Sequence, residues 1–258
     1  MLRVFNADLH IHTCLSPCAS LDMTPQKIIR EAVRKKLSII AITDHNSAEN
    51  VEAVIRAARY ADLTDLLVIP GMEVTTSEEA HIIALFTSVD NAVSMQEIVF
   101  DHLLPGENDE DLFGLQVIAN EHDEVEGLND RLLIGATTMS VDEVIETIHK
   151  LQGLAVAAHI DRESYSLIGQ LGFIPENLEL DGIEVSRRLT IDKAKFQFRE
   201  YTKFPFVISS DAHNLNEIGV CITSIILEKL CMNEFRMALE GRGGRQVLSE
   251  PKEGQGLF

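Results

Sequence analysis

Short apolar runs of strand length alternate with stretches of helical periodicity along most of this chain. The expected strands are Ser38–Thr43, Leu66–Pro70, His81–Phe86, Leu154–Ala158, Gly182–Val185 and Pro205–Ser209. Apolar residues recur three and four positions apart, as in amphipathic helices, over Thr24–Lys35, Ala48–Ala61, Ser140–Gln152 and Ile191–Tyr201. Strands that alternate with helices predict successive βα units around a parallel sheet, and therefore an α/β fold.

The length of 258 residues suits one large α/β barrel or two small domains. We expect a single domain over residues 1–240, followed by a Gly-containing C-terminal tail over 241–258. Residues 87–135 break the alternation with acidic stretches such as Asn108–Asp111. We interpret this region as an elaborated βα connection or lid, with a separate small domain as the alternative.

The formal net charge of −19 disfavours binding of long nucleic acid through a basic surface. A cluster of divalent cations would reverse that sign locally, so small anionic substrates remain compatible. The first residues lack the apolar stretch of a secretory signal, and no apolar run reaches the roughly 18 to 20 residues that span a bilayer. Four cysteines without an export signal indicate reduced thiols. We therefore expect a cytoplasmic protein without a membrane partner, of undetermined oligomeric state.

Imidazoles and carboxylates gather at the ends of the expected strands, where barrel enzymes assemble their active sites. His10 and His12 are two residues apart, so on a strand they point to the same side. Asp44 and His45 end one apolar strand, and Glu73 follows the next. Further along the chain come His81, His159, Asp211 and His213.

Imidazole and carboxylate together suit zinc, manganese or iron, whereas Mg²⁺ and Ca²⁺ prefer oxygen ligands alone. These residues offer more ligands than one tetrahedral ion uses, so a multinuclear site follows if the strand ends converge. For a single position such as His81, the alternative is a buried neutral imidazole bonded to backbone. We expect two or three divalent metal ions.

Several motifs, in order, resemble the PHP (polymerase and histidinol phosphatase) superfamily. They are His10-x-His12, Thr43-Asp44-His45, Gly71-x-Glu73, His159 and Asp211-x-His213. The resemblance implies a distorted (β/α)7 barrel of TIM-like form with a trinuclear metal site, and phosphoester hydrolysis as the usual activity. A first metal would be held by His10, His12, Glu73 and Asp211, a second by Glu73, His81 and His159, and a third by His45 and His213.

The resemblance also implies one further metal ligand shortly after the His-x-His pair. In this sequence the loop that follows the pair contains Asp22 as its only carboxylate, so Asp22 is the candidate. Cys14 and Cys18 lie in the same loop, where a thiolate could join the cluster or respond to oxidants. The alternative for both cysteines is packing as small apolar residues.

The expected function is that of a metal-dependent phosphoesterase that uses a metal-activated water on a small phosphomonoester, nucleotide or short oligonucleotide phosphate. Asp44 and His213 are candidates for orienting groups or moving a proton, and Arg162 for gripping a substrate phosphate. Arg187 and Arg188 are weaker candidates of the same kind. The alternatives are histidinol-phosphatase-like activity, a non-catalytic or regulatory scaffold, and an amidohydrolase-type enzyme acting on C–N bonds.

Overall fold

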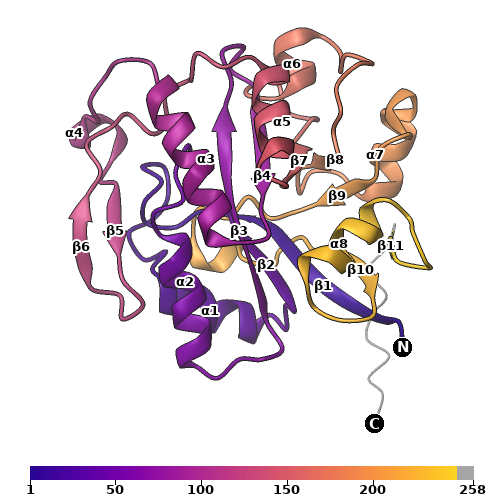
Figure 1. Ribbon diagram of the computed structural model, residues 1–258, viewed down its shortest axis with the longest axis horizontal. Helices are drawn as coiled ribbons and strands as arrows, with labels where there is room; N and C mark the ends of the chain where they lie inside the picture. Colours follow the sequence, from indigo (N-terminus) through magenta and orange to yellow (C-terminus); the bar gives the residue numbers. More distant parts are fainter. Residues whose placement is uncertain (249–258) are drawn as a thin grey trace.

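The computed structural model describes residues 1–248, which build a nine-stranded sheet curved into a barrel (Figure 1). The strand order is β11-β10-β1-β2-β3-β4-β7-β8-β9. The strands are β1 (Arg3–Ile11), β2 (Ile39–Ile42), β3 (Leu67–Thr75), β4 (His81–Leu85), β7 (Leu154–Ala157), β8 (Gly182–Val185), β9 (Phe206–Ile208), β10 (Thr223–Leu227) and β11 (Gln246–Val247). The helices are α1 (Pro25–Arg34), α2 (Val51–Tyr60), α3 (Val89–His102), α4 (Glu110–Phe113), α5 (Val141–Lys150), α6 (Leu167–Leu171), α7 (Ile191–Gln197) and α8 (Met232–Leu239), with short 3₁₀ helices η1 (Arg199–Tyr201) and η2 (Leu215–Glu217).

The β9 end of the curved sheet returns to β1. Ile11 forms a parallel bridge with Ala212, which follows β9. Here the His12 amide donates to the Ala212 carbonyl at 3.0 Å, and the Ala212 amide donates to the His10 carbonyl at 3.1 Å. The sheet therefore nearly closes, and the expected TIM-like α/β barrel is confirmed.

The sheet departs from uniform βα alternation at β4. This strand runs antiparallel to both β3 and β7. Only residues 76–80 separate β3 from β4, and a parallel crossover would need a dozen or more residues. The barrel is distorted here because a hairpin replaces a βα unit.

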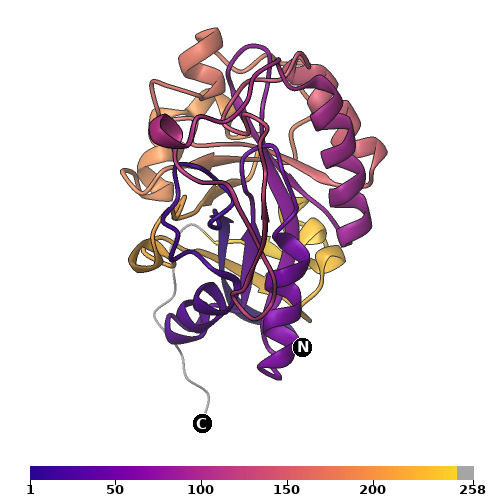
Figure 2. The same cartoon turned by 90° about the vertical axis from the view of Figure 1, so that its left-hand side faces the viewer.

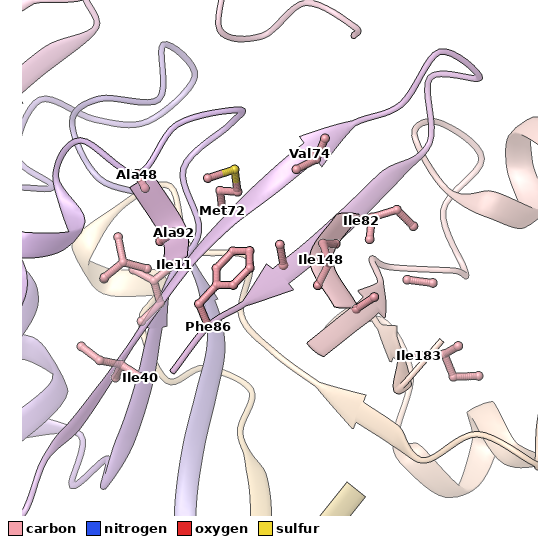
Figure 3. Close-up of a cluster of buried hydrophobic side chains, with 14 of the residues drawn as sticks. Ile11, Ile40, Ala48, Met72, Val74, Ile82, Phe86, Ala92, Ile148 and Ile183 are labelled. Atoms are coloured by element: carbon pink, nitrogen blue, oxygen red, sulfur yellow. The ribbon is translucent and has the colours of Figure 1, made fainter. Parts of the chain in front are cut away.

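Two apolar clusters lie on opposite faces of the sheet. The inner cluster takes alternate residues from the strands, such as Leu9, Ala41 and Ile83, and is closed by Phe235 of α8. The outer cluster packs the sheet against the surrounding helices, and Figure 3 shows several of its side chains on one face of the sheet. Figure 2 shows α3 running along the outside of the barrel.

A register shift in β1 changes which side chains face inward. The pairing of β1 with β2 is irregular between Asp8 and Ile11. Leu9 packs in the inner cluster but Ile11, two residues on, packs in the outer one. Because strand side chains alternate, this change of face requires a bulge, and bulges commonly redirect side chains at active sites. His10, within this irregular stretch, and His12, just after it, both reach Asp211 at the mouth of the barrel.

Residues 87–135 form a long connection between β4 and α5. It contains α3, α4 and a separate hairpin of β5 (Val117–Ala119) and β6 (Val125–Leu128). The hairpin is tied to the start of the chain, because the Val117 amide donates to the Cys14 carbonyl at 2.9 Å and Asp123 accepts from the Gln26 amide at 2.8 Å. Helix α3 was not expected from the sequence, although Ala92, Met95 and Val99 are its buried residues.

The first part of the expected C-terminal tail belongs to the sheet. Residues 246–247 form β11, which pairs with β10. Arg245 adds an ion pair to Glu234 of α8 at 2.9 Å. Residues 249–258, the rest of that expected tail, lie outside the described residues. Among residues 1–248, no helix has the length and apolar character that crossing a bilayer requires.

Any side chain at Gly71 in β3 is expected to destabilise the fold. A Cβ atom there would lie 2.6 Å from the Ala84 carbonyl oxygen and 3.1 Å from that of Ile42. Both contacts are to backbone of neighbouring strands, which cannot move independently. We expect Gly71→Ala to lower the free energy of unfolding by about 1–3 kcal/mol, the usual cost of overpacking, as measured by urea denaturation.

Gly127 provides the control for this prediction. A Cβ at Gly127 meets only the Ile118 side chain at 3.9 Å, an ordinary contact. Gly127→Ala should therefore change the free energy of unfolding by about 0.5 kcal/mol or less. Equal urea midpoints for Gly71→Ala and the wild type would contradict the prediction.

Candidate metal centre

The imidazoles and carboxylates expected at strand ends converge at the mouth of the barrel. They come from β1, from the segments that follow β2, β7 and β9, and from the β3–β4 hairpin. All are buried except Asp211 and His213, which are partly exposed, the His213 side chain to 24%. The members of this cluster are His10, His12, His45, Glu73, His81, His159, Asp211 and His213.

Glu73 lies at the centre of the cluster. Its Oε1 atom is 2.8 Å from His81 Nδ1 and 3.1 Å from His159 Nε2. Its Oε2 atom is 3.1 Å from His45 Nδ1. The His-x-His pair completes the ring, with His10 Nε2 at 3.4 Å from Oε1 and His12 Nε2 at 3.5 Å from Oε2. The two oxygens thus face different imidazoles, as a carboxylate that bridges two cations requires.

Asp211 is the second carboxylate of the cluster. Its Oδ1 atom lies 3.3 Å from His10 Nε2 and 3.2 Å from His12 Nε2, while those two nitrogens are 3.1 Å apart. The backbone φ angle is 50° at Asp211 and 29° at His159. Left-handed conformations are costly for residues other than glycine and concentrate at functional sites, where the surrounding structure holds them.

Several sets of ligand atoms among the described residues are close enough to share an ion. One is His10, His12 and Asp211, described above. In three others the atoms lie within 4.8 Å of one another: His10, His12 and Glu73; His45, Glu73 and His81; and His12, His45 and His213. The resemblance implied that His45 and His213 hold one metal ion together. The structure also places His45 close to Glu73 and His81.

The residues present fit divalent metal ions. His45 Nδ1 and His159 Nδ1 are buried without a hydrogen-bond partner among the described residues. His45 Nδ1 is 3.1 Å from a Glu73 oxygen yet is not aligned for a hydrogen bond, as expected for two ligands of one ion. A mixed set of imidazole nitrogens and carboxylate oxygens suits zinc, manganese or iron.

Burial keeps part of the cluster neutral. Burial lowers the pKa of His81 to about 4, although Glu73 acts in the opposite direction. Burial and the charge of His213 lower the pKa of His12 well below its usual range. Imidazole binds metal in its neutral form, so these two side chains are ready to act as ligands near neutral pH.

Asp44 lies behind the cluster and not in the cavity. Its Oδ1 atom accepts hydrogen bonds from the Thr13 amide and the Ser16 hydroxyl, both at 2.7 Å, and its Oδ2 atom accepts from the Thr13 hydroxyl at 2.8 Å. Ser16 Oγ in turn lies 2.9 Å from His12 Nδ1. Asp44, expected as a catalytic residue, is therefore placed to orient His12 through Ser16.

Glu184 of β8 supports two of the histidines and was missed in the sequence. Its Oε2 atom lies 3.0 Å from His10 Nδ1 and accepts a hydrogen bond from the His159 amide at 3.1 Å. Carboxylates that bond the second nitrogen of a ligating imidazole fix its orientation and tautomer. The available signal was a carboxylate inside the apolar run Gly182–Val185.

We expect Glu184→Gln to weaken metal binding by about 10- to 100-fold, the usual effect of losing such a supporting carboxylate. The amide removes the negative charge beside His10 while keeping the shape of the side chain. Metal affinity is measured by competition with a chromophoric chelator. Glu179→Gln, outside the cluster, is the control, and an unchanged affinity in Glu184→Gln would refute this role.

The structure does not bring Asp22 to the cluster. Its side chain is 69% exposed and forms an ion pair with Lys27. The Cys18 thiol, from the same loop, instead lies against the imidazoles of His45 and His213. Burial raises the pKa of this thiol, but the two imidazoles lower it by more, and the pKa falls to about 6.

A cavity of about 430 Å³ opens onto the cluster. It is lined by Glu73, His81, His159, Arg162, Glu163, Ser164, Tyr165, Arg188 and Asp211. Arg162 donates to Asp211 Oδ2 at 2.6 Å, and the Tyr165 ring stacks on His81 with centroids 4.8 Å apart. Arg187 instead pairs with Glu217 at 3.1 Å and does not line the cavity.

The chain belongs to the PHP domain family, whose model matches residues 8–171. It is 33% identical over 81 residues to the 5'-3' exoribonuclease Rnm of Salmonella typhimurium, covering 30% of this chain and 26% of that protein. The chain spans only about a quarter of the length of the curated relatives it matches, 27% and 26%.

Solved structures share the fold over most of the chain. The lesion-specific endonuclease PfuEndoQ from Pyrococcus furiosus matches with a TM-score of 0.72 and 20% identity, covering 95% of this chain and 58% of that one. A proposed metal-dependent phosphoesterase from Bifidobacterium adolescentis matches with a TM-score of 0.53 and 19% identity, covering 80% and 87%. These similarities establish the PHP-type barrel.

Proposed function

We propose that this protein is a metal-dependent phosphoesterase acting on a small phosphorylated substrate. The observation that carries the proposal is the position of Glu73, whose two oxygens lie within 3.5 Å of imidazoles from five histidines. Two or three divalent ions of zinc, manganese or iron fit this donor set. Such ions, when bound, activate water as a nucleophile and offset charge on the phosphoryl oxygens.

The residues of the cavity suit an anionic substrate. Arg162 and Arg188 line it beside the cluster, and a guanidinium binds phosphate oxygens in a bidentate manner. Arg162 pairs with Asp211, so in this role its guanidinium turns from that carboxylate toward the phosphate. His213 is the most exposed imidazole of the cluster. It can carry a proton only while no ion is bound to it, so its two expected roles, proton carrier and metal ligand, exclude each other.

The size and charge of the protein favour a small substrate. The cavity of about 430 Å³ accommodates a mononucleotide or a similar phosphomonoester. A net charge of −19 opposes tight binding of a long phosphate backbone. A structure of Endonuclease Q holds a 27-mer duplex with an abasic lesion at its active site, so duplex DNA belongs among the substrates to be tested.

The test measures metal content and hydrolysis in the same samples. Elemental analysis gives the ions per chain, and p-nitrophenyl phosphate, nucleotides, short oligonucleotides, histidinol phosphate and a lesion-containing duplex are tested with added Mn²⁺ or Zn²⁺. We expect bound metal in the wild type, and hydrolysis of a small phosphoester that is lost in His159→Ala. His122→Ala, at an exposed histidine outside the cluster, is the matched control.

Two outcomes would overturn the proposal. A folded protein that binds no metal and hydrolyses none of these compounds would support a non-catalytic scaffold. Hydrolysis of the duplex at a rate well above every small substrate would replace the small substrate with DNA, while leaving the metal centre in place.

A further inference from the structure

The loop that carries Cys18 is fixed to the histidine-bearing segments on both sides of the cysteine. Two residues before it, the Ser16 hydroxyl accepts from the His45 amide at 3.1 Å and lies 2.9 Å from His12 Nδ1. Two residues after it, the Ser20 amide donates to the His213 carbonyl at 2.8 Å. The backbone therefore holds residue 18 beside these histidines, whatever its side chain.

The sulfur of Cys18 lies beside a group of three imidazoles, those of His12, His45 and His213. Cys18 is an exposed residue whose thiol lies against the imidazoles of both His45 and His213. These two histidines and His12 offer ligand atoms within 4.8 Å of one another. His45 is 6% exposed, and its Nδ1 atom, which has no hydrogen-bond partner among the described residues, faces Glu73 Oε2 at 3.1 Å. The loop's carboxylate, Asp22, is at the surface and does not fill this place.

The other three cysteines, all within the described residues, differ from Cys18. Cys14 is buried against the β5–β6 hairpin, with its sulfur 3.7 Å from the Val117 carbonyl and 3.7 Å from Asn50 Nδ2. Burial raises the pKa of the Cys14 thiol to about 12, so this thiol stays protonated. Cys221 follows η2 and Cys231 precedes α8, and neither belongs to the ligand sets of the cluster.

We propose that the Cys18 thiolate is a ligand of one divalent ion, together with the imidazoles of His45 and His213. This inference rests on the proposed metal centre and names a ligand within it. Binding releases the thiol proton to solvent, and a metal–sulfur bond forms without any oxidation. A thiolate is a soft ligand that favours zinc, iron or cobalt over manganese and magnesium. This position is therefore selective for the softer ions.

Cobalt(II) titration of the metal-free protein tests the ligand directly. Cobalt bound to any nitrogen and oxygen set shows weak visible d–d bands, and only a cobalt–thiolate bond adds an intense near-ultraviolet charge-transfer band. We expect both features in the wild type and in Cys231→Ser. In Cys18→Ser and Cys18→Asp the charge-transfer band should disappear while the d–d bands remain, because the other ligands still bind cobalt.

The outcomes separate this inference from the proposed function. Visible bands without a charge-transfer band in the wild type would overturn the role of Cys18 and leave the metal centre intact. A charge-transfer band that persists in Cys18→Ser would assign the thiolate to another cysteine. A protein that binds no cobalt would refute the metal centre, and the ligand with it. Near-normal cobalt content in Cys18→Asp, beside a reduced content in Cys18→Ser, would further support a ligand at residue 18.

Discussion

Glu73→Gln is expected to abolish metal-dependent hydrolysis. The carboxylate contacts imidazoles through both oxygens, and the amide replaces one of these oxygens with a nitrogen that is no metal ligand. Losing a residue that merely supports a ligand costs about 10- to 100-fold. Loss of Glu73, the proposed ligand at the centre of the cluster, should therefore lower kcat/KM by more than about 100-fold, with fewer metal ions per chain by elemental analysis.

Glu79→Gln makes the same chemical change at an exposed position of the β3–β4 connection and serves as the control. Its metal content and kcat/KM should equal those of the wild type. Circular dichroism establishes that Glu73→Gln remains folded. Full activity in a folded Glu73→Gln protein would show that Glu73 is not a ligand.

Metal removal is expected to destabilise the fold. The cluster holds imidazole nitrogens close together, and His10 Nε2 lies 3.1 Å from His12 Nε2. A cation at the centre of the cluster needs these nitrogens in one place, so it binds the folded chain and not the unfolded one. A ligand present at roughly 1,000 times its Kd stabilises by about 4 kcal/mol. We expect that difference in the free energy of unfolding between the zinc-loaded and the chelator-treated protein, measured by urea denaturation.

The control is the same pair of urea denaturation measurements on Glu73→Gln, with and without zinc. The free energy of unfolding of this variant should respond far less to added zinc. Magnesium chloride controls for ionic strength. If zinc raised the stability of the wild type and Glu73→Gln equally, the stabilising ion would bind elsewhere on the chain.

Much of the metal centre could be predicted because its residues follow apolar strands. The carboxyl ends of parallel strands share one edge of a barrel, so His45, Glu73 and His159 were expected to meet. The expected ligands gather there except Asp22, which pairs with Lys27 at the surface. Residue type alone favoured the carboxylate in that loop, but the hydroxyl of Ser16 and the amide of Ser20 bind the histidine segments and hold Cys18 near them instead.

The features that the sequence did not reveal depend on contacts between distant segments. The bulge in β1 is visible only in its pairing with β2, although it determines where His10 and His12 point. The function of Glu184 depends on a bond to His10, 174 positions away. The antiparallel direction of β4 follows from the short connection of residues 76–80, which leaves no room for a parallel crossover.

The bridge that closes the barrel lies among the residues of the histidine cluster. It joins Ile11 to Ala212. His10 and His12 are the chain neighbours of Ile11, and Asp211 and His213 are those of Ala212. Any local unfolding that breaks this bridge also separates these side chains. The amides of His12 and Ala212 should therefore exchange hydrogen with solvent more slowly as ions bind, so their protection reports occupancy from the backbone itself.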